Sequence, residues 1–483
     1  MNIQTQASLS PAVEVSEIAK MKLIFSAQKQ AFAECSYPEV SLRITQLKKL
    51  KQIVIANQQD IIEGLSADFG HRCHDETRIA EILTFVEGIN ATIKHLGQWI
   101  KPSKRKVSML FLPASNKVIY QPLGVVGIMV PWNYPLFLSL GPLIGALSAG
   151  NRVMIKLSEF TPNFNKCLKE VLAEIFDENQ VAVITGEVTI SSEFSSLPFD
   201  HMFFTGSTPI GRLVMASAAK NLTPVTLELG GKSPVIISAD IDIKLAAERV
   251  CFGKSLNAGQ TCVAPDYVLC PRDKKEEFVE AYAEAFFSMY PGFNESLDYS
   301  SIINEQQYQR LQGLLKDAET KGAKLMKMSC AIKSTTQPRK MAPILIDDVQ
   351  DDMRIMQEEL FGPILPIIGY EELDQAIDYI NERPRPLALY IFSFNKKVQD
   401  KIVYNTHSGG VCINNTMTHL AQDDMPFGGV GQSGMGCYHG HEGFLTFSKA
   451  KGIHKIGRIN SAKMIFPPYG GFIHRFFYRL FIR

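Results

Sequence analysis

The pattern of hydrophobic and polar residues predicts alternating strands and helices over most of the chain. Continuous apolar runs rich in β-branched residues, at 124–130 and 153–156, are typical of buried strands. A stretch rich in Leu, Ala and Gly between them predicts a helix. Short strands are expected again at 181–185 and 201–204. Strand, helix and strand in this order form a βαβ unit, so this part of the chain predicts an α/β fold.

The flanking regions extend this picture. Apolar residues recur at helical spacing from Val15 to Trp99, which predicts helices that cover a sheet. Residues 107–121 are expected to be extended β structure broken by prolines, forming an arm that reaches out of the domain. A second α/β domain is predicted by helices at 274–290, 304–322 and 374–381 and by strands at 268–270, 389–393 and 410–414.

Length and composition narrow the class of protein. A chain of 483 residues is too long for one hydrophobic core, so two or more domains are expected. The formal net charge of +1 gives no reason to expect a nucleic-acid partner. No apolar run could span a bilayer, no signal pattern begins the chain, and nine cysteines lack paired spacing. We therefore expect a cytoplasmic protein with reduced thiols.

One cysteine stands in a segment suited to chemistry. Cys262 lies in FGKSLNAGQTCVAP (252–265), where small and polar residues let the backbone approach a ligand. A thiol alone is more often a small core residue. Glu228, however, ends an apolar strand-like run just upstream and is followed by Gly230 and Gly231, where the chain must turn tightly. A thiol and a carboxylate at the ends of neighbouring segments are what acyl transfer through a thioester requires.

Polar residues also follow the predicted strands of the βαβ unit. Asn133 comes just after the first strand, and Lys156 and Glu159 come at the end of the next. Ligands of such sheets bind beyond the carboxyl ends of the strands, which favours a common site. Taken singly, Asn133 would be interpreted as a helix cap, and Lys156 with Glu159 as a surface ion pair.

A third strand end predicts a phosphate site. In FTGSTPIGRLVM, Gly206 and Gly211 bracket a turn from strand into helix, and Ser207 is placed to cap that helix. Free amides at a helix N-terminus bind phosphate groups, and Gly206 permits close approach. The pattern is not the GxGxxG fingerprint. It supports a phosphate site only because it follows a predicted strand in a chain where strands and helices alternate.

One polar segment looks like a metal cluster. The stretch DFGHRCHDET contains His71, Cys73 and His74, but their spacing matches no familiar metal site. We therefore expect no metal, and we interpret the segment as a solvated connection between two helices.

Several motifs together resemble the NAD(P)-dependent aldehyde dehydrogenase superfamily. They occur in the family's order and cover nearly the whole chain: PWNYP around Asn133, FTGSTPIG around Gly206, ELGGK around Glu228, GQTC around Cys262, EELFGP around Glu359, and PFGGVGQSG around Gly428. The PWNYP variant and the short N-terminal region resemble the dimeric, class 3-like branch. Within that branch, four stretches resemble the bacterial coniferyl aldehyde dehydrogenases: DFGHR, QPLGVVGIMVPWNYPLFLSLGPL, SLPFDHMFFTGST and NLTPVTLELGGKSP.

The resemblance implies a fold and a domain division. It implies the aldehyde dehydrogenase fold, with a Rossmann-like cofactor-binding domain, an α/β catalytic domain and a small β oligomerisation arm that builds a homodimer. The expected boundaries are 1–101 with 123–230 for the cofactor-binding domain, 231–430 for the catalytic domain, and 102–122 with 446–458 for the arm.

The resemblance also implies catalytic roles. Cys262 would attack the aldehyde, and the Asn133 side chain with the Cys262 backbone N–H would stabilise the oxyanion. Hydride transfer to the cofactor would leave a thioester, and Glu228 would activate water to release a free acid. The substrate would be an aromatic aldehyde such as coniferyl aldehyde, or a medium- or long-chain aliphatic one. A non-catalytic member of the fold would usually lack the cysteine or the glutamate.

Similarity assigns the remaining site residues as well. Glu159 can accept hydrogen bonds from ribose hydroxyls and would repel a 2′-phosphate, so NAD is expected, with NADP left open. The cofactor residues are Lys156 and Glu159 at the adenosine ribose, Ser207 with Gly206 and Gly211 at the pyrophosphate, and Glu359, Phe361 and Trp132 toward the nicotinamide. The residues expected to line the substrate tunnel are Tyr134, Phe137 and Leu138.

The C-terminal tail, residues 465–483, leaves two interpretations open. Arg475, Arg479 and Arg483 recur every four residues on one helical face, and aromatic residues supply a broad apolar surface. The aromatics could pack on the body of the protein, or on a partner subunit near the tunnel. Alternatively, the helix could bind weakly to an anionic membrane surface, although it is too short and too charged to span one.

Overall fold

The computed structural model describes residues 11–327 and 337–482, so residues 1–10 of the expected cofactor-binding domain and Arg483 of the tail lie outside the described residues. Its first sheet has six strands in the order β15-β7-β6-β3-β4-β5, and all neighbours pair in parallel except β15 with β7. The strands are β3 Val125–Met129, β4 Arg152–Lys156, β5 Val181–Ile184, β6 His201–Thr205, β7 Val225–Glu228 and β15 Gly434–Met435.

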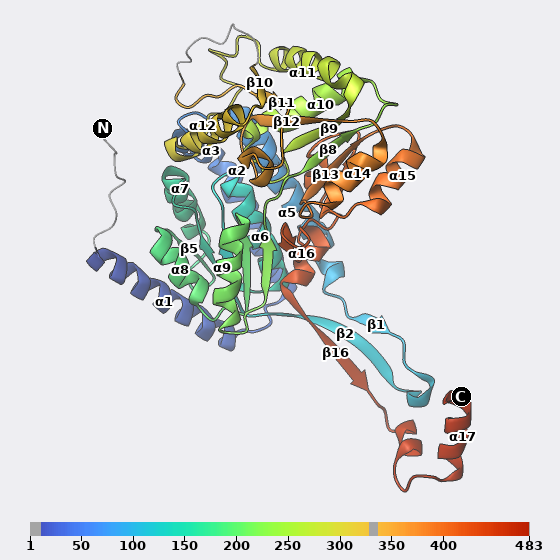
Figure 1. Ribbon diagram of the computed structural model, residues 1–483. Helices are drawn as coiled ribbons and strands as arrows, with labels where there is room; N and C mark the ends of the chain where they lie inside the picture. Colours follow the sequence, from blue (N-terminus) through green and yellow to red (C-terminus); the bar gives the residue numbers. More distant parts are fainter. Residues whose placement is uncertain (1–10, 328–336, 483) are drawn as a thin grey trace.

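Helices cover this sheet, and the predicted βαβ unit is confirmed as β3, α6 and β4 (Figure 1). The sequences of these strands are continuous apolar runs because both faces of the sheet are buried. The helices between the strands are α6 Pro135–Ala149, α7 Pro162–Ala173, α8 Val188–Ser196 and α9 Thr208–Ala219. The N-terminal helices are α1 Pro11–Glu34, α2 Val40–Ala56, α3 Gln58–Phe69, α4 His74–Thr77, the π-helical turn η1 Arg78–Leu83 and α5 Thr84–Trp99.

The second sheet has seven strands in the order β10-β11-β12-β9-β8-β13-β14, parallel except for β10. Its strands are β8 Pro234–Ile237, β9 Tyr267–Pro271, β10 Lys324–Lys327, β11 Ile344–Asp347, β12 Ile364–Tyr370, β13 Ala388–Phe392 and β14 Gly410–Ile413. Its helices are α10 Ile243–Ser255, α11 Lys275–Met289, α12 Glu305–Thr320, α13 Arg354–Gln357, α14 Leu373–Asn381 and α15 Lys396–Asn405. The predicted alternation in the second half of the chain is thereby confirmed.

A three-stranded antiparallel sheet projects from the body as an arm (Figure 1). Its strands are β1 Ser103–Arg105, β2 Ser115–Pro122 and β16 Ser448–Lys455. Helix α16 (Gly440–Thr446) packs on α5 and α6 and leads into β16, which pairs with β2 over its full length.

The tail occupies the far end of the arm, where the turn η6 (Ser461–Ile465) is followed by α17 (Phe472–Phe481). Of the interpretations left open for the tail, packing of its aromatics on the body of their own chain is excluded, because β16 carries the chain away from the body. The turn η6 instead contacts η2 (Met109–Phe111) and α17. Within the described part of the chain, no helix is both long enough and apolar enough to cross a bilayer.

Candidate active site

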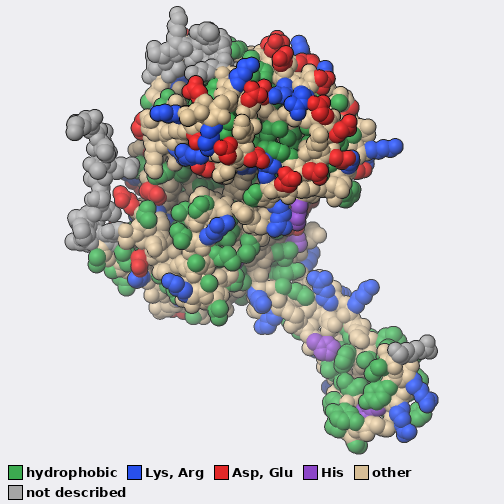
Figure 2. Space-filling model, viewed as in Figure 1, with side chains coloured by type: hydrophobic (Ala, Val, Ile, Leu, Met, Phe, Trp, Pro, Cys, Tyr) green, Lys and Arg blue, Asp and Glu red, His purple; other side chains and the backbone are tan. Residues whose placement is uncertain are grey.

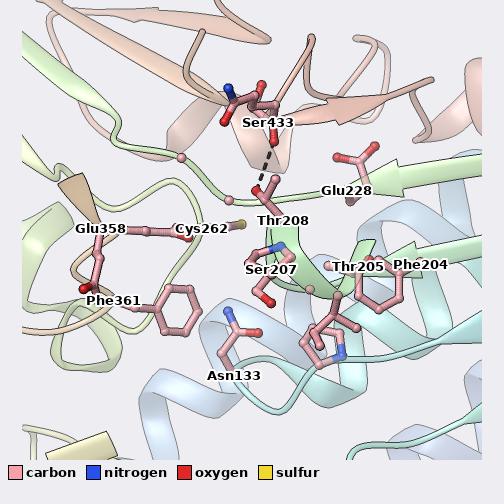
Figure 3. A pocket seen from close by; sticks show the side chains of 18 of the residues that line it. Asn133, Phe204, Thr205, Ser207, Thr208, Glu228, Cys262, Glu358, Phe361 and Ser433 are labelled. Carbon is pink, nitrogen blue, oxygen red and sulfur yellow. Dashed lines mark hydrogen bonds between the residues drawn. The ribbon is translucent and has the colours of Figure 1, made fainter. Parts of the chain in front are cut away.

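A cavity of about 1140 Å³ lies at the carboxyl ends of β3, β4, β6 and β7 and reaches the loop that carries Cys262. Its position follows from the parallel sheet, whose loops converge at this edge. The cavity brings together eleven of the fourteen residues expected at the site, several of which are seen in Figure 3: Trp132, Asn133, Leu138, Lys156, Glu159, Gly206, Ser207, Glu228, Cys262, Glu359 and Phe361.

Cys262 follows an unusual turn. Asn257, Ala258 and Gly259 all have left-handed backbone conformations, with φ of 49°, 52° and 74°. A side chain at Gly259 would strike the carbonyl of Gly362, so the close approach needs glycine. Burial, followed by the charges of Glu359 and Glu228, raises the pKa of Cys262 to about 12. The resting thiol is therefore protonated near neutral pH.

Glu228 ends β7 and faces the same cavity (Figure 3). Its side chain is 3% exposed, and neither carboxylate oxygen has a hydrogen-bond partner among the described residues. Burial raises its pKa well above the ordinary value for a carboxyl group. A buried carboxyl group without partners is costly to the fold, and such groups concentrate at functional sites.

The N-terminus of α9 forms one wall of the cavity. The Ser207 side chain does not cap the helix, and a Cβ at Gly206 would meet the Phe204 ring at 2.5 Å. Gly211 does not line the cavity: a Cβ there would meet the side chain of Leu229 at 2.6 Å, so Gly211 lets α9 pack closely on the chain after β7. First-turn amides beside Gly206 and Ser207 suit a phosphate group.

Lys156 and Glu159 lie on the adjacent wall, after β4. Lys156 is 2% exposed, and its Nζ donates to the Leu157 carbonyl oxygen at 2.7 Å. Burial lowers its pKa to about 8, and the charge of Glu159 opposes that shift. The pair offers one donor and one acceptor side by side.

Aromatic side chains and a second carboxyl group also line the cavity. The rings of Trp132 and Phe361 meet edge to face, with centroids 5.3 Å apart, and Phe361 has φ +48°. Glu359 lies against Gly230, where a Cβ would overlap its carboxylate. Burial, followed by the charge of Asp266, raises the pKa of Glu359 to about 8.

The residues expected in the substrate tunnel divide between this cavity and its surroundings. Leu138 lines the cavity, but Tyr134 and Phe137 do not. Tyr134 is buried, and its hydroxyl lies 3.1 Å from the Thr261 hydroxyl, behind Cys262. Phe137 is half-buried and lines a separate, much smaller cavity together with His439.

A set of buried charged residues beside the site was not predicted from the sequence. The prediction of a solvated connection in DFGHRCHDET is wrong, because Arg72, Cys73 and Glu76 are buried there and Arg72 forms an ion pair with the equally buried Glu81. The apolar residues Phe85 and Ile89 follow Glu81 by four and eight positions, so helical spacing alone puts Glu81 on a buried face. Among the described residues, no group of three His, Cys, Asp or Glu could hold a metal ion.

Comparison with known proteins fits this geometry. The model of the aldehyde dehydrogenase family matches residues 7–453. A Pseudomonas aeruginosa protein named "Probable coniferyl aldehyde dehydrogenase" is 54% identical over 467 residues, which is 97% of each chain. A structure described as the substrate-bound state of Staphylococcus aureus AldH is 39% identical, with a TM-score of 0.90 over 96% of this chain and 99% of that one. A Mycobacterium tuberculosis aldehyde dehydrogenase solved with NAD+ is 29% identical, with a TM-score of 0.82 over 90% of each chain. This chain therefore belongs to the aldehyde dehydrogenase family and is an NAD(P)-dependent enzyme that oxidises aldehydes to acids.

Proposed function

We propose that Cys262 is the nucleophile of this aldehyde dehydrogenase and that Glu228 is the general base that completes its reaction. One observation carries the proposal: a thiol and a buried carboxyl group without hydrogen-bond partners among the described residues line the same cavity. A binding or structural member of the fold has no use for so costly an arrangement. The same proposal assigns residues 1–101 and 123–230 to the cofactor and 231–430 to catalysis.

The proposed reaction follows from these groups. Cys262 loses its thiol proton to solvent, and the thiolate bonds to the aldehyde carbon, so that the carbonyl oxygen becomes an oxyanion. The Asn133 side-chain amide and the Cys262 backbone N–H donate hydrogen bonds to that oxygen. Bound NAD(P)+ would supply the hydride acceptor, and the acyl group would then remain on Cys262 as a thioester. Glu228 takes a proton from water as the water attacks the thioester, and it returns that proton to the departing Cys262 sulfur, which releases the acid and the thiol.

The residues around the cavity fit a dinucleotide. We assign the pyrophosphate to the N-terminus of α9 at Gly206 and Ser207, because its first-turn amides border the cavity. Glu159 supports NAD over NADP, because its carboxylate accepts hydrogen bonds from ribose hydroxyls and repels a 2′-phosphate. The remaining assignments are Lys156 at the adenosine ribose, and Trp132, Glu359 and Phe361 at the nicotinamide side.

For the substrate we propose an aromatic aldehyde of the coniferyl type. The support is the name of the 54% identical Pseudomonas relative and the apolar side chain of Leu138 in the cavity. A second candidate is a long-chain aliphatic aldehyde, because α17 displays large apolar side chains of the kind that contact lipid, with Phe472 81% exposed.

Initial rates of NADH formation test the function and the substrate together. We expect a higher kcat/KM for coniferyl aldehyde than for a long-chain aliphatic aldehyde, and no activity above background for Cys262→Ala. An active Cys262→Ala variant would refute the proposed chemistry. A preference for the aliphatic aldehyde would refute only the proposed substrate.

We also propose that two copies join through the arm. Residues 101–122 and 447–483 contain 13 Lys and Arg and no Asp or Glu, which leaves a formal charge of −12 on the rest of the chain. Figure 2 shows basic and apolar side chains on the projecting arm, with acidic side chains confined to the body. The arm therefore complements the body of a second copy in charge. The apolar tip is proposed to pack on that copy, with an anionic membrane surface as its alternative partner. The absence of paired cysteine spacing supports a cytoplasmic location.

A further inference from the structure

Two buried side chains from separate parts of the chain hold the backbone carbonyl of Asn133. Arg72 Nη1 donates to this oxygen at 2.7 Å, and Asn257 Nδ2 donates to it at 3.0 Å. We propose that Arg72 is a positioning residue that fixes the Asn133 loop against the Cys262 loop, so that the Asn133 amide faces the reacting carbonyl oxygen. The proposal rests on the oxyanion role that we propose for Asn133.

Arg72 is locked in place from several sides. It lies in the loop between α3 and α4, and its side chain is fully buried. Its guanidinium is flanked by the rings of Phe69 and Tyr134, at 5.0 Å and 4.7 Å from their centroids. Its Nη2 lies 3.0 Å from Glu81 Oε1. The planar fork of arginine reaches the carbonyl and the carboxylate at once, which the single ammonium of lysine cannot do in the same geometry.

Glu81 extends this anchor to the helix that follows Asn133. Its other oxygen accepts hydrogen bonds from the backbone N–H groups of Leu136 and Phe137, at 2.8 Å and 3.1 Å. These amides belong to the first turn of α6, which has no intrahelical acceptors for them and favours a negative charge. Glu81 itself lies in the π-helical turn η1, an element often found at functional sites. The Arg72–Glu81 pair thus fixes the chain at the Asn133 carbonyl and at the start of the helix that follows it.

The Cys262 loop is attached at the same place. Asn257 lies in the left-handed turn that precedes Cys262, and its side chain reaches the Asn133 carbonyl. A second link joins the Tyr134 and Thr261 hydroxyls, which belong to the neighbours of Asn133 and Cys262. The two groups that must meet at the substrate are therefore carried on loops that are tied together one to five residues away. Arg72 connects the Asn133 loop to the N-terminal helices as well.

A buried ion pair is not in itself a sign of a stabilising interaction, because desolvation offsets the attraction. The reaction rate, in contrast, depends strongly on the positions of the groups at the reacting centre, and a displacement of about 1 Å can lower it roughly 10²-fold. The chain offers a matched control in Arg43, which is 2% exposed and donates to the carbonyls of Ser148 and Ala149 at the opposite end of α6. Arg43 holds the same helix but lies away from Asn133.

A double-mutant cycle tests the proposal. Arg72→Lys should lower kcat by roughly 10- to 100-fold, with little change in the Kd for NAD+ or in the alkylation rate of Cys262 by iodoacetamide. Asn133→Ala should lower kcat by about 10²–10³-fold. In the Asn133→Ala background, Arg72→Lys should cause little further loss, because the group it positions is gone. Arg43→Lys should leave kcat within about twofold while lowering Tm.

Each outcome has a definite meaning. Equal losses from Arg72→Lys in the wild-type and Asn133→Ala backgrounds would overturn the positioning role. A normal kcat for Asn133→Ala alone would instead refute the oxyanion role on which the proposal rests. If Arg72→Lys does not fold, Glu81→Gln takes its place in the same cycle, because it keeps an oxygen for the α6 amides and weakens the hold on Arg72. Additive losses for Glu81→Gln would overturn the proposal equally.

Discussion

The cavity and the arm place charged groups in opposite ways. In the cavity, ionisable side chains such as Glu228, Glu359 and Lys156 are largely buried. Burial raises the pKa of the two carboxyl groups and lowers the pKa of the lysine, which favours the uncharged form of each. On the arm, basic side chains are exposed and large apolar side chains lie in the open beside them. The cavity is thus lined by buried ionisable groups of this chain, whereas the arm exposes basic and apolar side chains that we propose a second copy covers.

The largest effect is expected at the centre of the cavity. Cys262→Ala should lower kcat by about 10⁴-fold or more, because no thioester can form. The Kd for NAD+ should stay the same, measured by quenching of protein fluorescence. Cys251→Ala is the matched control, because Cys251 is a fully buried thiol away from the cavity. Similar losses in both variants would mean that the cavity thiol has no special role.

Loss of the buried carboxyl group should have the next largest effect. Glu228→Gln should slow turnover by roughly 10²–10⁴-fold, and the acyl-enzyme should accumulate as a stoichiometric burst of NADH in stopped-flow traces. Because burial raises the pKa of Glu228, protonation disables it at a higher pH than it would an ordinary carboxyl group. Wild-type deacylation should therefore rise with pH above the range in which an ordinary carboxyl group titrates, and the variant should lose that rise. An unchanged pH profile in Glu228→Gln would assign the base to another group.

Substitutions on the arm should weaken the proposed dimer. Replacing Phe472 and Phe476 with Glu should weaken the dimer by roughly 10- to 100-fold in Kd, because each change removes a large apolar contact and adds the opposite charge to a basic surface. Sedimentation velocity at several concentrations measures this, and Tyr404→Glu, on the exposed surface of the body, is the control. An unchanged dimer, combined with loss of binding to anionic vesicles in flotation, would assign the tip to membranes instead.

The smallest effect is expected at the cofactor wall. Glu159→Gln should shift the ratio of kcat/KM for NAD to that for NADP by about tenfold toward NADP, because it removes a charge that repels the 2′-phosphate. Rates with both cofactors at fixed aldehyde concentration measure the ratio. A ratio that does not change would show that Glu159 does not face the 2′ position.

The sequence predicts the residues that line the cavity better than it predicts the buried residues that hold them in place. Strand ends in a parallel sheet converge, so residues such as Lys156 and Glu228 could be placed at one edge from the apolar runs before them. Arg72 escaped prediction because a polar segment usually lies in solvent, and only the folded chain brings Glu81 and two rings around it. Tyr134 turns away from the cavity because its hydroxyl pairs with Thr261, a contact between residues far apart in sequence.

The separation of charge along the arm has a practical consequence for handling the protein. The sequence pI of about 7.6 suggests a molecule that binds weakly to either kind of ion exchanger near neutral pH. A single copy should instead bind to both at low ionic strength, with the arm on a cation exchanger and the body on an anion exchanger. Once two copies have joined, each arm neutralises part of its neighbour, and retention on the cation exchanger should fall.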